Sequence, residues 1–311
     1  MMVDRADQVT HNTGVASTLR AGVPLVAAAL FVFAAACYGS YRVDCFHLRA
    51  IAEIVTAKEP VPQRRVIRLL RWVHHNERST ANESYFLLKR LGATPVQVLE
   101  GGGDCADKSR LLSAMLREIG IPSTMLMCFD ERNGRSTHTV VEARVRDGAY
   151  MVVDPAYNMA FPRGDGGGYH GLLALRGDPT ILPRRLDELI EQRGRHSSVR
   201  SYDRARGAFG AASSINWNKN AVTRMAGDLM GVALDDELYR VRRPVVLEEP
   251  KLAIAYVALG LSGFSVLVSV NLRRSRRRVS GSVLNVRGSS ERSGVVTRSG
   301  PSVPFGSCSQ G

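Results

Sequence analysis

Two runs of 21 residues without a charged side chain constrain this chain more than any other feature. The first lies between Arg20 and Arg42, and the second lies between Lys251 and Arg273. As a helix rising 1.5 Å per residue, each run would be about 31 Å long, close to the ~30 Å thickness of a bilayer's hydrocarbon core. Neither run carries the polar stripe of a surface helix in a soluble protein. The pattern therefore predicts membrane-spanning helices at 21–41 and 252–272.

The first run also has the features of a secretory signal peptide. Val23 to Ala36 would be its apolar region, and Ala34 and Ala36 match a small-residue cleavage pattern. Cys37 follows three alanines, which resembles a weak lipoprotein box. The preceding segment is long and nearly neutral, which favours an uncleaved anchor. Either alternative exports the residues that follow.

The second run indicates the orientation of the chain in the membrane. Five arginines lie between 273 and 278, whereas Glu248 and Glu249 precede the run. Because positively charged residues stay in the cytoplasm, both termini are predicted to be cytoplasmic and residues 42–250 to lie outside, at the inner or plasma membrane. The Ser- and Gly-rich segment beyond Val279 is predicted to be disordered.

The net charge of +13 is concentrated in the C-terminal part of the chain. Residues 1–39 are neutral, residues 40–250 carry +5, and residues 251–311 carry +8. The middle of the chain is therefore not a basic surface for nucleic acid, and no nucleic-acid partner is expected. A hydrophobic content of 44% excludes a wholly disordered chain.

The five cysteines show neither metal-ligand nor disulfide spacing. They are Cys37, Cys45, Cys105, Cys128 and Cys308. Cys37 falls in an apolar run and Cys308 in the tail. The other three, Cys45, Cys105 and Cys128, would face the oxidising side of the membrane. If any two pair, Cys45 and Cys128 would be the pair.

Apolar periodicity between the two runs predicts helices followed by strands. Glycine and proline stops separate these segments. Residues 169–239 are predicted to form short helices and loops. The predicted helices are 63–76, 82–92 and one from Cys105 to Gly120, and the predicted strands are 124–129, 137–145 and 149–154, joined by turns at 130–134 and 146–148.

Three residues in this part form a pattern typical of nucleophilic catalysis. Cys105 follows three glycines at the first turn of a helix, where the helix dipole favours a thiolate. His138 and Asp154 lie on the two strands of a hairpin. A three-residue loop pairs Val145 with Ala149, which puts Asp154 diagonally across from His138 at ~7–8 Å between backbones.

Each of these residues also has an ordinary structural explanation. A lone cysteine is usually a small buried hydrophobe, and an aspartate before proline usually forms a turn. Glu142 shares the His138 face and competes with Asp154 as the carboxylate that orients the ring, but it lies roughly 13 Å along the same strand. The ordered combination of Cys, His and Asp is the specific signal.

The stretch from Gly101 to Pro162 resembles the transglutaminase-like superfamily of papain-type cysteine enzymes. The matching blocks are GGGDCADKSRLLSAMLREIGIPS, HTVVEARV and AYMVVDPAYNMAFP. The resemblance implies an α+β core, in which a helix carrying Cys105 packs on an antiparallel sheet carrying His138 and Asp154. It also implies that Cys105 is the nucleophile, His138 the general base and acid, and Asp154 the residue that orients His138.

Two positions depart from the family pattern. Ser123 and Thr124 stand where family members often have Arg, and Tyr150 stands in the region where Trp is frequent. Neither departure removes a reacting group, and both leave substrate choice open.

The sequence thus predicts acyl transfer on an amide or ester of a protein or peptide at the cell envelope, by hydrolysis or transamidation. The Cys105 backbone N–H would be one oxyanion donor, with Gln97 and Trp72 as candidates for the second. No metal or organic cofactor is implied. The alternative is a non-catalytic scaffold, or an accessory protein with partners in the production or export of surface polysaccharide.

The predicted organisation has six parts. They are a cytoplasmic N-terminus (1–20), a first membrane helix (21–41), a transglutaminase-like domain (42–165), a helical and loop extension of that domain (166–250), a second membrane helix (252–272) and a basic, disordered cytoplasmic tail (273–311).

Overall fold

The computed structural model describes most of the chain between residues 5 and 290. Left out of the description within these limits are 77–79, 130–134, 147, 195–198, 200–201, 203–208, 211 and 218. The predicted turn at 130–134, part of the turn at 146–148 and the end of the tail therefore lie outside the described residues. The chain divides into two compact units, one of residues 32–259 and one of residues 1–31 with 260–311.

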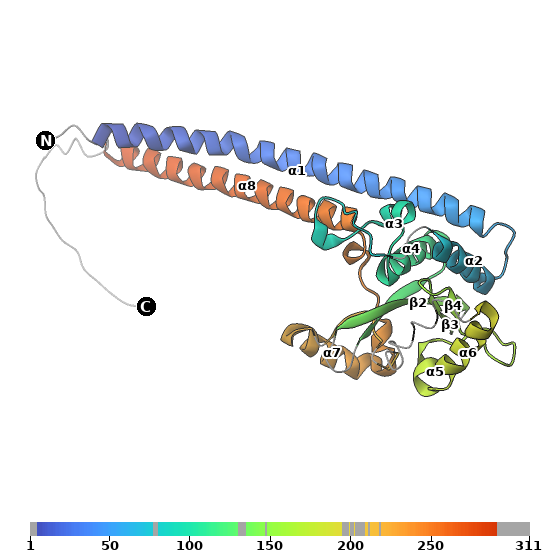
Figure 1. Ribbon diagram of the computed structural model, residues 1–311. Helices are drawn as coiled ribbons and strands as arrows, with labels where there is room; N and C mark the ends of the chain where they lie inside the picture. Colours follow the sequence, from blue (N-terminus) through green and yellow to red (C-terminus); the bar gives the residue numbers. More distant parts are fainter. Residues whose placement is uncertain are drawn as a thin grey trace, which may run out of the picture. The chain divides into compact units, whose positions relative to one another are not determined.

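Two long helices contain the apolar runs (Figure 1). Helix α1 is Arg5–Val55, and helix α8 is Pro250–Ser290. Within them, Gly22–Val55 and Pro250–Arg274 are long and apolar enough to cross a membrane, judged by length and composition, and only 17% of each apolar window is buried. The low burial separates them from the core helices of a soluble protein. Within the unit of residues 1–31 and 260–311, Ser262 Oγ donates a hydrogen bond to the Ala27 carbonyl at 2.8 Å.

Both helices extend beyond the predicted limits. Helix α1 continues past residue 41 to Val55, and its Leu48 and Ala52 are buried in the core of the domain. Helix α8 continues through Ser290, so the prediction of disorder from residue 273 is wrong for 273–290. Arginine is a good helix former and no proline occurs in this stretch, so the helix continues through it despite two glycines.

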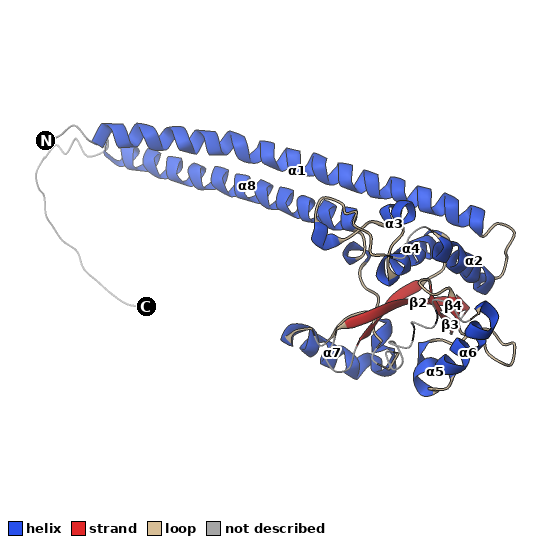
Figure 2. Ribbon diagram, in the orientation of Figure 1, coloured by secondary structure: helices blue, strands red, loops and turns tan. Residues whose placement is uncertain are grey.

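The domain is built on an antiparallel sheet, drawn in red in Figure 2. Its strand order is β1-β2-β3-β4. The strands are β1 (Ser123–Phe129), β2 (Ser136–Arg146), β3 (Ala149–Asp154) and β4 (Met159–Ala160). Val141 pairs with Val153, which is the register that the sequence predicted for the body of the hairpin. Next to the turn the register shifts, and Arg146 rather than Val145 pairs with Ala149. Strand β4 was not predicted, because two residues carry no periodicity.

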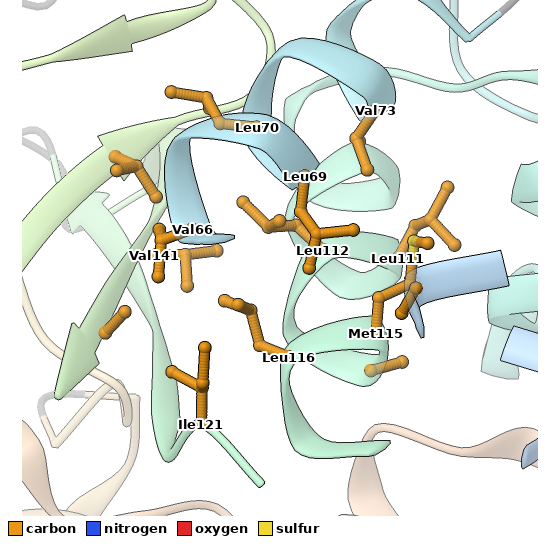
Figure 3. Packing of buried hydrophobic residues seen from close by; sticks show 14 of the residues in the cluster. Val66, Leu69, Leu70, Val73, Leu111, Leu112, Met115, Leu116, Ile121 and Val141 are labelled. Atoms are coloured by element: carbon orange, nitrogen blue, oxygen red, sulfur yellow. The ribbon is translucent and has the colours of Figure 1, made fainter. Parts of the chain in front are cut away.

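Helices cover both faces of the sheet (Figure 2). One face packs against α2 (Pro62–His75) and α4 (Cys105–Glu118), and α3 (Pro95–Gly101) packs on α4. Leucine and valine side chains of α2 and α4 interlock there with Val141 (Figure 3). The second cluster, on the opposite face, includes residues of α5 (Leu172–Gly177) and α6 (Ile181–Arg193). The domain is therefore α+β, as predicted, with apolar helices on either side of it in the sequence.

In the described residues, the elements not yet named are one helix and three 3₁₀ turns. These are α7 (Ala221–Leu234), η1 (Lys89–Leu91), η3 (Asp235–Arg240) and η4 (Val245–Leu247).

The predicted helix from Asn82 to Gly92 is wrong, since only the η1 turn forms there. The Asn82 side chain donates to the Gln97 and Gly102 carbonyls instead of capping a helix. The unpredicted helix α3 begins at the capping box of Thr94 and Gln97.

The Cys45–Cys128 pairing, which the sequence left open, does not form. Cys37, Cys45, Cys105 and Cys128, the cysteines in the described part of the chain, are all free. Cys45 lies on α1 and Cys128 lies in the second hydrophobic cluster of the sheet, whereas Leu48 and Ala52 of α1 pack in the first cluster.

Candidate active site

Cys105 is the first residue of α4. Asp104 caps the helix by accepting hydrogen bonds from the Ala106 and Asp107 backbone N–H groups at 2.9 and 3.1 Å. Gly102 has a φ of 71°, and a Cβ on Gly103 would lie 2.3 Å from the Asp107 Cβ. These two positions require glycine, because a side chain would be strained at the first and would collide at the second. The glycines thus let the chain turn tightly into the helix that carries the thiol.

His138 and Asp154 form a buried hydrogen-bonded pair on the second face of the sheet. His138 is 7% exposed and Asp154 is fully buried. His138 Nε2 and Asp154 Oδ2 are 2.5 Å apart. The other oxygen, Oδ1, accepts from the backbone N–H groups of Ala156 and Tyr157 at 3.0 and 3.2 Å. Asp154 therefore forms the turn expected before a proline and also holds the histidine ring.

Charge and hydrogen bonding determine the protonation of His138. Burial lowers the pKa of His138, but the negative charge and hydrogen bond of Asp154 outweigh burial. A hydrogen bond with the Cys105 side chain acts in the same direction. The net result is a pKa well above the usual value for histidine, which favours an imidazolium beside the sulfur of Cys105.

Glu142, the competing carboxylate, is engaged elsewhere. It is 2% exposed and lies 2.9 Å from Arg240 Nε through its Oε2. Its Oε1 accepts from the Leu172 backbone N–H at 2.8 Å. Glu142 thus ties η3 and the start of α5 to the sheet, whereas Asp154 holds His138.

Two tyrosines that the sequence did not single out flank the His138 ring. Tyr157 and Tyr202 pack against it in T-shaped arrangements, with ring centroids 5.5 and 5.4 Å from its centroid, and the two tyrosine centroids are 4.7 Å apart. Tyr157 was predictable in principle, because it follows the Asp154 turn by three residues. Tyr202 comes from a distant segment, and no local pattern marks it.

A second unpredicted network supports the site from α2. Lys108, one turn after Cys105, is 2% exposed and donates from Nζ to the His74 carbonyl at 2.8 Å. His74 Nδ1 lies 3.1 Å from the Pro155 carbonyl. Burial lowers the pKa of His74, and the positive charge of Lys108 lowers it further, so a neutral ring donates this bond. The end of α2 is thereby tied both to α4 and to the residue after Asp154.

The two candidates for a second oxyanion donor lie in different surroundings. Gln97 Oε1 accepts from the Thr94 backbone N–H at 2.9 Å in the cap of α3. Trp72 is partly buried and packs against the first hydrophobic cluster. Within the described residues, no three His, Cys, Asp or Glu side chains are grouped as metal ligands.

The family of the domain follows from a comparison with known protein families. Residues 49–155, which include Cys105, His138 and Asp154, match the family model of the transglutaminase-like superfamily. The chain therefore carries a transglutaminase-like domain, and the predicted family is confirmed. No curated protein matches the chain.

One solved structure is also similar in part. It is a presumed protease from Parabacteroides distasonis, 16% identical over 43% of this chain, with a TM-score of 0.25. The match covers 30% of that protein's length. A likeness this partial says nothing of what the present chain does.

Proposed function

We propose that this chain is a membrane-anchored transglutaminase-like cysteine enzyme that transfers acyl groups from amides or esters through a thioester on Cys105. The observation that carries the proposal is the buried His138–Asp154 pair, with the Cys105 side chain hydrogen-bonded to the same ring. A nucleophile, a proton carrier and a group that orients the carrier are what covalent acyl transfer requires.

The proposed chemistry proceeds in two halves. With Nε2 held by Asp154, Nδ1 is the ring nitrogen left to exchange a proton with Cys105. The Cys105 thiolate attacks the carbonyl carbon, and the tetrahedral intermediate expels an amine or alcohol that takes the proton from His138. Water or an amine then gives a proton to His138, attacks the thioester and releases the thiolate. Water would give hydrolysis and an amine would give transamidation.

The developing oxyanion needs hydrogen-bond donors. The Cys105 backbone N–H is in the first turn of α4, where helix N–H groups lack partners within the helix. Gln97 and Trp72 remain the candidates for the second donor. The Oε1 of Gln97 is used in the α3 cap, so its Nε2 would have to serve.

The membrane arrangement is part of the proposal. The arginines that follow the second apolar run support cytoplasmic termini and an extracytoplasmic catalytic domain. Residues 166–250 would complete the domain, because Leu172 and Leu186 are buried in the cluster on the His138 face. Protease added to spheroplasts should digest the domain and spare the tail, and the reverse pattern would overturn the orientation.

Thiol labelling followed by acyl trapping tests the catalytic assignment. The full chain in detergent is treated with iodoacetamide at pH 6 and mapped by mass spectrometry. We expect Cys105 to be labelled and Cys128 to stay unlabelled, since burial raises the pKa of the Cys128 thiol. With p-nitrophenyl acetate or candidate envelope peptides, wild type should accumulate an acyl group on Cys105, and Cys105→Ala should not. Equal labelling of both cysteines and no trapped acyl group would favour a non-catalytic scaffold.

A further inference from the structure

The loop between α2 and α3 exposes an unusual run of apolar side chains. The sequence from Tyr85 to Leu88 is YFLL. Tyr85, Leu87 and Leu88 are 48%, 56% and 57% exposed. Isolated exposed leucines are ordinary, but adjacent exposed apolar residues mark interaction sites. Leu87 also has a φ of 59°, a strained conformation that residues other than glycine seldom adopt.

This loop lies at the position where the second apolar helix begins. The Phe86 ring centroid is 5.6 Å from Lys251 Nζ. Lys251 is the last charged residue before the uncharged run of α8, and it forms a 2.6 Å ion pair with Asp44 of α1. Asp44 in turn lies just beyond the uncharged run of α1. The Asp44–Lys251 pair therefore marks the same boundary on both helices, and Phe86 contacts that boundary.

The chemistry of the loop matches a lipid headgroup region. Aromatic side chains are enriched at the membrane interface. The exposed basic residues Lys89 and Arg90 follow the apolar run directly, and Glu83 is the single acidic residue between 82 and 90. Basic groups next to inserted apolar groups suit anionic phospholipids, because the headgroup charge attracts them while the apolar side chains bury in the acyl boundary.

We propose that Tyr85–Leu88 docks into the headgroup and upper acyl region of the bilayer in which the chain is anchored. This inference rests on the proposal that α1 and α8 span the membrane, and it adds a third point of contact. The loop binds lipid and not another protein, because Phe86 contacts the Asp44–Lys251 boundary and basic residues follow the apolar ones.

The docking has a consequence for the substrate. The backbone N–H of Asn82, at the start of the loop, donates to Asp107 Oδ2 at 3.0 Å, and its Nδ2 donates to the Gly102 carbonyl at 2.7 Å. The chain from Asn82 to Phe86 can cover at most about 14 Å. The turn before Cys105 is thus held close to the bilayer surface, and the acyl donor would be a protein or peptide segment held at that surface.

Tryptophan quenching by lipid tests the docking. Leu88→Trp and, as a matched exposed leucine on α5, Leu173→Trp are prepared in the full chain. Each is reconstituted in nanodiscs whose phospholipids carry bromine on the upper acyl carbons, and the wild-type signal of Trp72 and Trp217 is subtracted. We expect the fluorescence added by Leu88→Trp to fall by about twofold, as for an interfacial ring, and that of Leu173→Trp to change little.

A charge-reversal variant distinguishes binding of the loop to lipid from binding to a protein. Lys89→Glu combined with Arg90→Glu should weaken the quenching in anionic nanodiscs and leave it unchanged in neutral ones. Equal quenching at both tryptophan positions would overturn the proposal. A second outcome would also overturn it. In that outcome lipid bromine does not quench the tryptophan at position 88, and iodide loses access to it only when other membrane proteins are added, because the loop then binds a protein. Extraction of the chain from membranes by carbonate would instead overturn the spanning helices.

Discussion

The two faces of the sheet differ in composition although the same strands form both. Towards α2 and α4, strands β2 and β3 direct Val141, Ala143 and Val153 into a cluster whose buried members are Ala, Val, Leu, Ile and Met. Towards the opposite side, the alternate positions of the same strands carry His138, Glu142 and Asp154. The cluster on that side also contains buried tyrosines and phenylalanines from other segments. Because side chains alternate along a strand, one hairpin can supply stability on one face and chemistry on the other.

This contrast implies that stability and turnover can be changed separately. Substitutions on the aliphatic face should lower the free energy of unfolding without a specific effect on turnover. Substitutions among the polar groups of the other face should divide into those that act on turnover and those that act on stability.

The largest expected effect is on turnover, from Asp154→Asn. The amide favours the wrong tautomer of His138, so acylation by p-nitrophenyl acetate should fall on the order of 10³- to 10⁴-fold. Stopped-flow release of p-nitrophenol measures the acylation rate, with Cys105→Ala as the blank. An acylation rate within tenfold of wild type would remove Asp154 from the proposed mechanism.

The next effect is on stability, from Leu112→Ala on the aliphatic face. Leu112 is fully buried, so the lost contacts and the cavity should lower the free energy of unfolding by about 3 kcal/mol. The melting temperature of the full chain in detergent should fall by about 6–12 °C, followed by tryptophan fluorescence. Leu173→Ala, a substitution at an exposed leucine, serves as the control and should change the unfolding free energy by less than about 0.5 kcal/mol.

Glu142→Gln tests the division within the polar face. Glu142 is paired with the largely buried Arg240 guanidinium at 2.9 Å, and the change to glutamine removes the negative charge of that pair. We expect a loss of about 2 kcal/mol in unfolding free energy, with acylation within about twofold of wild type. Adding Arg240→Met should recover part of the stability. A turnover defect as deep as that of Asp154→Asn would show that the two carboxylates act together.

The smallest effect, taken per pH unit, is a pH dependence of stability from His138. Its pKa in the folded chain is raised, so its contribution is fully present below the unfolded pKa of about 6.5 and is lost as pH rises towards the folded value. In that window the unfolding free energy of wild type should decline by up to about 1.4 kcal/mol per pH unit more than that of Asp154→Asn. Parallel pH curves between 7 and 9 would mean that Asp154 does not raise the pKa of His138.

The parts predictable from the sequence were those with local signals. The stripe Val66, Leu69, Leu70 and Val73 has the spacing of a helix, and the alternation around Val141 has the spacing of a strand, so α2 and β2 were predicted. The hairpin register could be predicted as well, because it follows from the loop length and the alternation of the two strands. The order of Cys105, His138 and Asp154 is read directly from the sequence. Whether these residues act in catalysis stays a prediction.

The parts that could not be predicted depend on partners distant in the chain. Asn82 has the properties of a helix cap, but its side chain bonds to Gln97 and Gly102. Tyr202 reaches the His138 ring from 64 positions away, and Lys108 is buried because the end of α2 supplies a carbonyl. Periodicity contains no information about such contacts, since it reports only which face of an element is apolar.

The collision that a Cβ on Gly103 would make with Asp107 affects how mutations at this position would be interpreted. Asp107 Oδ2 accepts the Asn82 backbone N–H at 3.0 Å, so displacing Asp107 also releases the beginning of the loop that carries Tyr85–Leu88. A single methyl group would thus disturb both the approach to the thiol and the loop that follows α2. A genetic screen would score residue 103 as intolerant as Cys105, although residue 103 has no side chain that takes part in any reaction.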